Sequence, residues 1–369
     1  MGKKLDLALA VLNGAVGDHL ARTGNGLATE MTLVSGGRPL PLEREALRRA
    51  LPSPTGRVAL LLHGLMSSED IWLHHDGADY GALLQRDLGI TPLYLRYNSG
   101  LAIADNGALL DALLARLMTV YPGVIEELIP IGYSMGGLVV RSACHVATSR
   151  AASESASTSS STSNATSVST SVSTSMSTSM STNTGAPGAW LPRVRRALYV
   201  GTPHQGAPME RAGRVIARIL RAVPDPYTQL AAQLAHLRSD GIKDLGDADL
   251  RHQDRAAGLP RIGLYDPRHP VPLLPQIQHY LVAGSLSKDP WLAALFGDSI
   301  VPLRSASDGA VVDAPSFALP PDHARIVSGV SHLDLAHSKA VYQHLRDWCA
   351  QPAPVVGTPA AAEPEGEGR

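Results

Sequence analysis

Residues 132–136 read Gly-Tyr-Ser-Met-Gly and place a serine between two glycines where two apolar segments meet. Residues 127–131 before the motif are short and apolar, as expected of a buried strand, and residues 137–147 after it have the length and apolar face of a helix. A strand that turns into a helix this abruptly presents the serine hydroxyl clear of the backbone, and glycine avoids a clash inside the turn. The pattern predicts that Ser134 is a nucleophile.

A nucleophilic serine needs a general base from a loop at the same edge of the sheet. His332 follows a strand-like run at residues 325–330 and precedes a helix that the apolar periodicity predicts over residues 335–348. His323 precedes that strand and would lie at the opposite edge. We therefore expect His332 to be the base.

A carboxylate that orients the base should follow another strand, between Ser134 and His332 in the chain. Residues 279–284 look like that strand, and Asp289, Asp298 and Asp308 lie beyond it. Spacing from the strand end favours Asp289, whereas the surrounding Gly-Asp-Ser-Ile-Val-Pro segment favours Asp298. We expect Asp298 to be the acid, with Asp289 and Asp308 as alternatives.

An oxyanion hole needs two backbone N–H donors beside the nucleophile. The apolar run at residues 58–62 ends in His63-Gly64, and the loop after such a strand supplies one donor, while the residue after the nucleophile supplies the other. The expected donors are the amides of Leu65 and Met135. Because backbone groups donate, the side chains at these positions carry little information.

Taken together, these segments resemble the α/β-hydrolase superfamily, in its lipase and esterase branch near GPI inositol-deacylase-like and bacterial triacylglycerol lipase-like proteins. The segments that carry the likeness are Leu62-His63-Gly64, Gly132 to Gly137, the Gly-Thr-Pro-His-Gln-Gly run at 201–206, Gly297 to Pro302, and Ser331-His332. The resemblance implies an α/β fold with a mostly parallel central sheet flanked by helices, and a Ser134–His332–Asp298 triad.

The expected activity is hydrolysis of a hydrophobic carboxylic ester, as in an esterase or lipase of lipid metabolism, with no cofactor. An acyltransferase or a thioesterase would use the same residues, because only the acceptor or the leaving group changes. A binding protein on an inactive hydrolase scaffold is the alternative from a different class.

The composition narrows the range of partners. The chain has 369 residues with a formal net charge of −1, so no electrostatic attraction to nucleic acid is expected. Two cysteines, Cys144 and Cys349, lie in predicted helices and are interpreted as small buried apolar residues. The expected partner is a small acyl ester, and the number of subunits stays open.

The N-terminal residues superficially resemble a signal peptide. Asp6 and Asn13 interrupt the apolar run, whereas the apolar residues between Leu5 and Leu20 follow helical spacing. We interpret the segment as an amphipathic helix packed on the domain and expect a cytoplasmic protein. No run reaches the roughly 20 apolar residues of a membrane span, so no integral membrane segment is expected.

The expected organisation has an N-terminal helical and extended segment at residues 1–54, a hydrolase domain at 55–350 and a disordered tail at 351–369. Within the domain, residues 148–188 are almost entirely Ser, Thr and Ala, which predicts a disordered or loose loop far from the active site. Residues 205–278 are much longer than a strand–helix connection requires, which predicts a helical cap over the site, with helices at 210–222 and 227–238.

His74, His75, Asp76 and Asp79 superficially resemble metal ligands. Adjacent histidines point apart and no partner at ligand spacing is evident, so a solvated loop without a metal is expected.

Overall fold

The computed structural model describes residues 3–74, 77–160, 188–204, 239–247, 249–251, 271–285 and 319–352. These residues form one eight-stranded sheet, with strands β1 (Thr32–Ser35), β2 (Arg38–Leu40), β3 (Arg57–Leu62), β4 (Thr91–Arg96), β5 (Glu127–Tyr133), β6 (Arg196–Val200), β7 (Gln278–Ser285) and β8 (Ala324–Ser328). Their order across the sheet is β2-β1-β4-β3-β5-β6-β7-β8. The six strands from β4 to β8 in this order are parallel, and β1 is antiparallel to both of its neighbours. The predicted mostly parallel α/β sheet is therefore confirmed.

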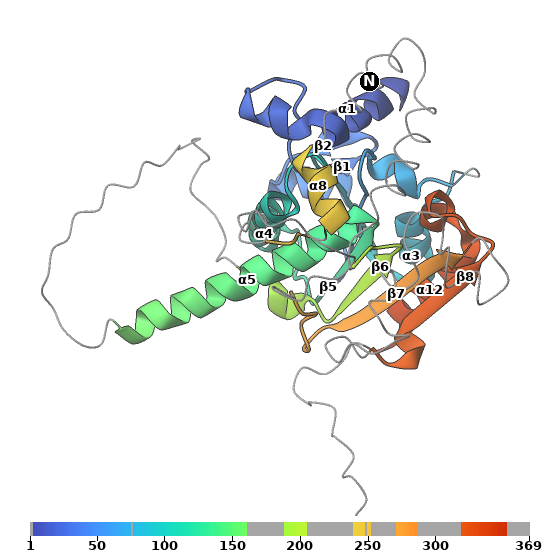
Figure 1. Ribbon diagram of the computed structural model, residues 1–369. Coiled ribbons are helices and arrows are strands. Elements are labelled where there is room, and N and C mark those ends of the chain that lie inside the picture. Colours follow the sequence, from blue (N-terminus) through green and yellow to red (C-terminus); the bar gives the residue numbers. More distant parts are fainter. Residues whose placement is uncertain are drawn as a thin grey trace, which may run out of the picture.

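Helices cover both faces of this sheet (Figure 1). They are α1 (Lys3–Arg22), α2 (Arg44–Ala50), α3 (Tyr80–Leu88), α4 (Ile103–Val120), α5 (Met135–Ser160), α8 (Asp240–Asp247) and α12 (Lys339–Ala350), with short 3₁₀ helices η1 (Glu69–Trp72), η2 (Leu191–Arg193), η3 (Pro321–His323) and η4 (Leu333–His337). Side chains of α4 and α5 belong to the core on one face, and those of α3 and α12 to the core on the other. None of the described helices combines the length and the apolar character needed to cross a membrane.

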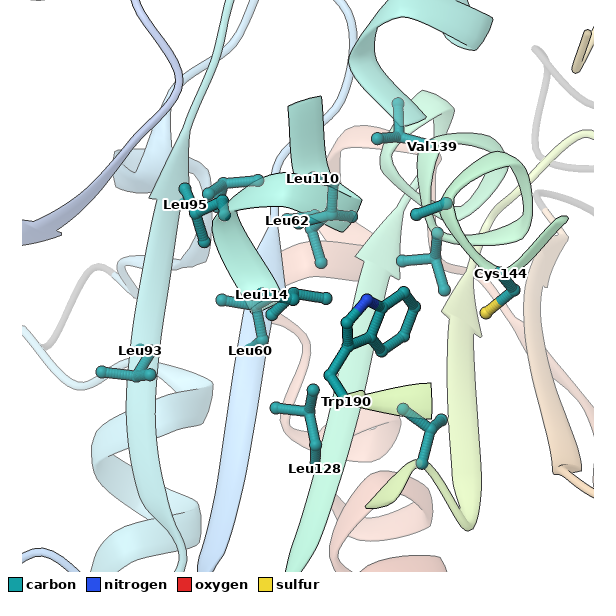
Figure 2. Close-up of a cluster of buried hydrophobic side chains, with 14 of the residues drawn as sticks. Leu60, Leu62, Leu93, Leu95, Leu110, Leu114, Leu128, Val139, Cys144 and Trp190 are labelled. Carbon is teal, nitrogen blue, oxygen red and sulfur yellow. The ribbon is translucent and has the colours of Figure 1, made fainter. Parts of the chain in front are cut away.

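The two-sided burial explains why the central strands are apolar throughout. Along β3, Leu60 and Leu62 pack on the α4–α5 side, whereas Ala59 and Leu61 pack on the α3–α12 side, because successive side chains of a strand point to opposite faces. Figure 2 shows the core on the α4–α5 side, in which leucines of β3, α4 and β5 lie beside the indole ring of Trp190 and those of β4 lie farther away. Cys144 and Cys349 are free thiols buried in these two cores, as the sequence predicts.

Helix α5 extends further than the sequence suggests. It runs to Ser160 and projects from the body of the protein (Figure 1), so residues 148–160 are helical and not the loose loop predicted for residues 148–188. Alanines and a glutamate in this stretch favour helix, and the hydroxyls of Thr148 and Ser153 bond to carbonyls four residues earlier, within the helix. Residues 161–187 lie outside the described part of the chain.

The N-terminal segment contributes to the same sheet through β1 and β2, and its helix α1 packs on the loops that follow β3 and β4. A Cβ atom at Gly14 would lie 2.3 Å from the Cγ atom of Met66, and one at Gly17 would lie 1.8 Å from the Oδ1 atom of Asn98. These contacts show backbone-close packing, for which glycine is required. Helix α1 is therefore packed closely on these two loops.

Helix α8 lies within the segment predicted as a cap, residues 205–278. The Ser239 hydroxyl donates to the Gly14 carbonyl of α1 at 2.6 Å, and the Asp244 carboxylate accepts the Ile103 amide at the start of α4 at 2.9 Å. Helix α8 therefore links α1 to α4, which covers one face of the sheet. The predicted cap helices at 210–222 and 227–238, and the tail residues 353–369, lie outside the described residues.

An ion-pair network lies at the edge of the sheet where the parallel strands begin. The buried Glu127 carboxylate accepts from Arg196 at 2.7 Å and from Arg57 at 2.9 Å. Arg196, which is fully buried, also donates to the Trp348 and Gln351 carbonyls, and Arg57 donates to the Cys349 carbonyl. The network joins β3, β5 and β6 to the last turn of α12.

Removing the shared carboxylate should destabilise this edge strongly, because two guanidinium groups would face each other with one of them fully buried. We expect Glu127→Gln to lower the free energy of unfolding by about 3–5 kcal/mol, measured by urea denaturation. The matched control is Glu45→Gln, which breaks the exposed Arg48–Glu45 pair of 2.8 Å and should cost less than about 1 kcal/mol. Equal losses in the two variants would contradict this account of the network.

Candidate active site

The chain passes from strand β5 to helix α5 through a single residue, Ser134. Its backbone has a φ of 52°, in the left-handed region, and its amide donates to the Val200 carbonyl of β6 at 2.8 Å. A non-glycine residue in this region carries a conformational cost of roughly 1–3 kcal/mol, which the surrounding structure must offset. The strained strand–serine–helix turn expected from the sequence is present.

Both glycines of the motif are required by contacts inside this turn. A Cβ atom at Gly132 would lie 2.5 Å from the Gly137 Cα atom, and one at Gly136 would lie 2.5 Å from the His63 carbonyl oxygen. The second contact involves the loop after β3, which also carries Gly64. A Cβ atom at Gly64 would lie 3.0 Å from the Ser134 Cβ atom. The absence of side chains therefore lets the loop after β3 approach the serine closely.

The two residues expected to supply the oxyanion donors lie on either side of Ser134. Met135 is the first residue of α5, so its amide has no carbonyl partner within the helix. Leu65 follows Gly64 in the loop that contacts Ser134. The next amide, that of Met66, is already engaged with the Ser99 hydroxyl at 3.0 Å, and Met66 itself has a φ of 55°. The Ser99 contact helps to hold this second strained turn.

His63 is buried behind the same loop. Its Nδ1 atom lies 2.8 Å from the Gly64 carbonyl oxygen, its Nε2 atom lies 3.3 Å from the Tyr97 amide, and its ring stacks on that of Tyr97 at 4.3 Å. Burial lowers the pKa of His63 to about 4, against a smaller opposing effect of the Gly64 carbonyl. A neutral ring with the proton on Nδ1 donates to Gly64 and accepts from Tyr97.

The Tyr97 hydroxyl completes this arrangement by donating to the His63 carbonyl at 2.8 Å. Tyr97 was not singled out in the sequence, where its only signal is its place immediately after a strand. Its side chain and that of Ser99 show that the loop after β4 supports the loop after β3.

His332 lies just after β8 as the residue before η4, and its side chain is buried. Its imidazole packs against Gly201 at the end of β6, where a Cβ atom would lie 3.0 Å from the imidazole Cε1 atom. The amide of Ser134 bonds to the residue before Gly201, so Ser134 and His332 flank the same strand end. The fold thus brings together two residues that are 198 positions apart.

The single helix predicted over residues 335–348 is wrong in one respect, because the chain breaks into η4 and α12. Ser338, between them, has extended backbone angles, φ −85° and ψ 127°. The buried Tyr80 hydroxyl lies 2.7 Å from the Leu335 carbonyl, an acceptor that a continuous helix would use. It also lies 2.8 Å from the Ser338 carbonyl, which accepts the Tyr342 amide at 2.9 Å as α12 begins. The break leaves His332 on a short turn pinned to α3.

The three candidate acids, Asp289, Asp298 and Asp308, lie outside the described residues. Strand β7 ends at Ser285, and β7 and β8 run parallel with Ser285 opposite Ser328. Strand β7 therefore ends at the same edge of the sheet as β8, the strand that His332 follows.

The loop expected to be solvated around His74 is partly buried, so that prediction is wrong for two of its residues. His74 is 6% exposed and packs edge-on against Tyr80, with ring centroids 5.2 Å apart. Asp79 caps α3 by accepting the Ala82 amide at 2.8 Å, and it also accepts from the Tyr94 hydroxyl. His75 and Asp76 lie outside the described residues, and the described ones include no group of three potential metal ligands.

The strand order, the parallel crossovers and the strand–serine–helix turn are those of an α/β-hydrolase fold. Similar solved structures include a mature lipase from Bacillus licheniformis, at 16% identity and a TM-score of 0.44, covering 80% of this chain and 93% of that one. Lipase 1 from Pelosinus fermentans is 11% identical with a TM-score of 0.43, covering 80% and 99% of the two chains. An α/β hydrolase from Novosphingobium aromaticivorans is 12% identical with a TM-score of 0.35, covering 78% and 87%. No protein-family model and no curated protein sequence matches the chain.

Because His63 is buried in its neutral form, we expect the free energy of unfolding to fall in acid. Its pKa is about 4 in the folded protein and about 6.5 when exposed, so the unfolded chain binds the extra proton between these values. The free energy of unfolding should therefore fall as the pH is lowered from about 6.5 to 4. Urea denaturation of His63→Asn across this range should show a slope reduced by up to about 1.4 kcal/mol per pH unit.

The matched control for this experiment is the exposed His19. His19→Asn should leave the pH slope of the wild type unchanged. An unchanged slope in His63→Asn would mean that His63 does not carry the acid sensitivity.

Proposed function

We propose that this protein is a serine hydrolase that cleaves carboxylic esters. The observation that carries the proposal is the arrangement around Ser134, a strained nucleophile position flanked by the close loop of Gly64 and by the strand end against which His332 packs. Strain of this kind persists where the surrounding structure imposes it, and it is concentrated at functional sites.

In the proposed reaction, the Ser134 Oγ atom attacks the acyl carbon while the imidazole of His332 takes the hydroxyl proton. The carbonyl π electrons move onto oxygen, and the amides of Leu65 and Met135 stabilise the resulting oxyanion, each by roughly 3–4 kcal/mol. Collapse of the intermediate breaks the ester C–O bond, and the imidazolium returns its proton to the leaving alcohol. Water, activated by His332, then attacks the acyl-enzyme by the same steps and releases the acid.

The surroundings of the loop after β3 support an apolar acyl group as the substrate. Met66 belongs to a small apolar core with residues of α1 and with Ile242 of α8, and Leu65 packs against that core. An ester with a hydrocarbon chain would extend apolar burial beside this surface, with up to about 0.8 kcal/mol for each methylene that fits. An acyltransferase or thioesterase would use the same groups with a different acceptor or leaving group.

The first test is covalent labelling. A fluorophosphonate probe should modify the wild type at Ser134, and Ser134→Ala should lose both labelling and hydrolysis of p-nitrophenyl esters, because the only attacking oxygen is removed. Peptide mass spectrometry identifies the labelled residue, and acetyl to palmitoyl esters test the acyl preference. Labelling at another serine would contradict the proposal, and turnover of thioesters alone would favour the thioesterase.

The second test concerns the acid, for which we propose Asp298. Asp298→Asn should fold normally and lose about 10⁴-fold in kcat, because an amide stabilises the wrong tautomer of His332, as the same change does in serine proteases. Asp289→Asn and Asp308→Asn are the matched controls and should remain near wild type in ester hydrolysis. A large loss in either control, with an active Asp298→Asn, would move the role to that aspartate.

A further inference from the structure

Tyr133, the residue immediately before Ser134, contacts the loop of His332. Its hydroxyl donates to the His332 carbonyl at 3.0 Å, and both groups are buried. The two rings lie at a centroid distance of 5.2 Å with planes 40° apart. The last residue of β5 therefore joins the nucleophile turn directly to the loop of the expected base.

The position of Tyr133 is itself well determined. Its ring lies in the core between the sheet and the α3–α12 layer, edge-on to Trp72 at 6.1 Å. On the side of the loop after β3, a Cβ atom at Gly64 would lie 3.2 Å from two carbon atoms of the ring. Packing on these sides leaves the hydroxyl little freedom, so it can act as a fixed reference point for His332.

The His332 carbonyl depends on such a contact for its orientation, because His332 lies beyond the hydrogen bonds that pair β8 with β7. A second hydrogen bond to this oxygen, from the Leu335 amide, is long at 3.3 Å. The orientation of this peptide group sets the direction of the Cα–Cβ bond of His332 and hence the place of its imidazole. A shift of about 1 Å at a catalytic group can cost about 100-fold in rate.

We propose that Tyr133 is a positioning residue that holds His332 in line with Ser134, an inference that rests on the proposed ester hydrolysis. The nucleophile and the base are then both placed by consecutive residues of one strand end. The hydroxyl acts through the His332 main chain and does not touch the substrate.

The test is Tyr133→Phe, which removes the hydroxyl and keeps the packed ring. We expect kcat for p-nitrophenyl ester hydrolysis to fall by between about 10- and 100-fold while KM stays within about twofold, because base alignment changes and substrate binding does not. The matched control is Tyr121→Phe. The Tyr121 hydroxyl donates to the Thr55 carbonyl at 2.8 Å, and its ring is buried near the opposite edge of the sheet.

Thermal unfolding of both variants separates positioning from stability. The inference is supported if the two variants lose a similar amount of Tm and only Tyr133→Phe loses kcat. A kcat in Tyr133→Phe within twofold of that of Tyr121→Phe, or a change confined to KM, would overturn it. If the Ser134→Ala variant is inactive and the Tyr133→Phe variant has normal activity, the inference fails and the proposed function stands. If Ser134 of the wild type does not react with the probe, both fail.

Discussion

The single-residue passage from β5 to α5 is the constraint on which the site depends. A strand and a helix joined this tightly leave Ser134 with a φ of 52°, and the turn closes only because its flanking glycines lack side chains. The same lack of side chains lets the His63 carbonyl approach Gly136, so the loop after β3 is drawn against the serine. The strain in the backbone and the assembly of the site therefore have one cause.

Loops at this edge of the sheet have no ladder of hydrogen bonds to hold them, and buried side chains take that role. Tyr97 and Tyr133, each at or just after a strand end, donate to the main-chain carbonyls of His63 and His332 respectively. The Ser99 hydroxyl has the opposite role, because it accepts the Met66 amide. Hydroxyl groups suit this task because one short donor satisfies a buried carbonyl without adding a charge.

The two edges of the sheet are stabilised by different means. At the edge where the parallel strands begin, Arg57 and Arg196 share one carboxylate and also bind the carbonyls that end α12. At the edge that carries Ser134, helices α1 and α8 pack over the loops through glycine contacts and through hydrogen bonds of Ser239 and Asp244. The Glu127 network therefore ties the strands to α12 at the edge opposite the serine.

The sequence by itself determined the central strands β3, β5, β7 and β8 and the positions of Ser134 and His332 at strand ends, because apolar periodicity and glycine spacing are local properties of the chain. It also predicted the amphipathic helix α1, whereas the break before α12 depends on the contact of Tyr80 with the Leu335 carbonyl. Only the tertiary structure decided which groups hold the site, since the Tyr133–His332 contact spans 199 positions and the Arg57–Cys349 contact spans 292. A tyrosine at a strand end has the same local signal whether its hydroxyl meets solvent or a buried carbonyl, and only folding selects between these environments.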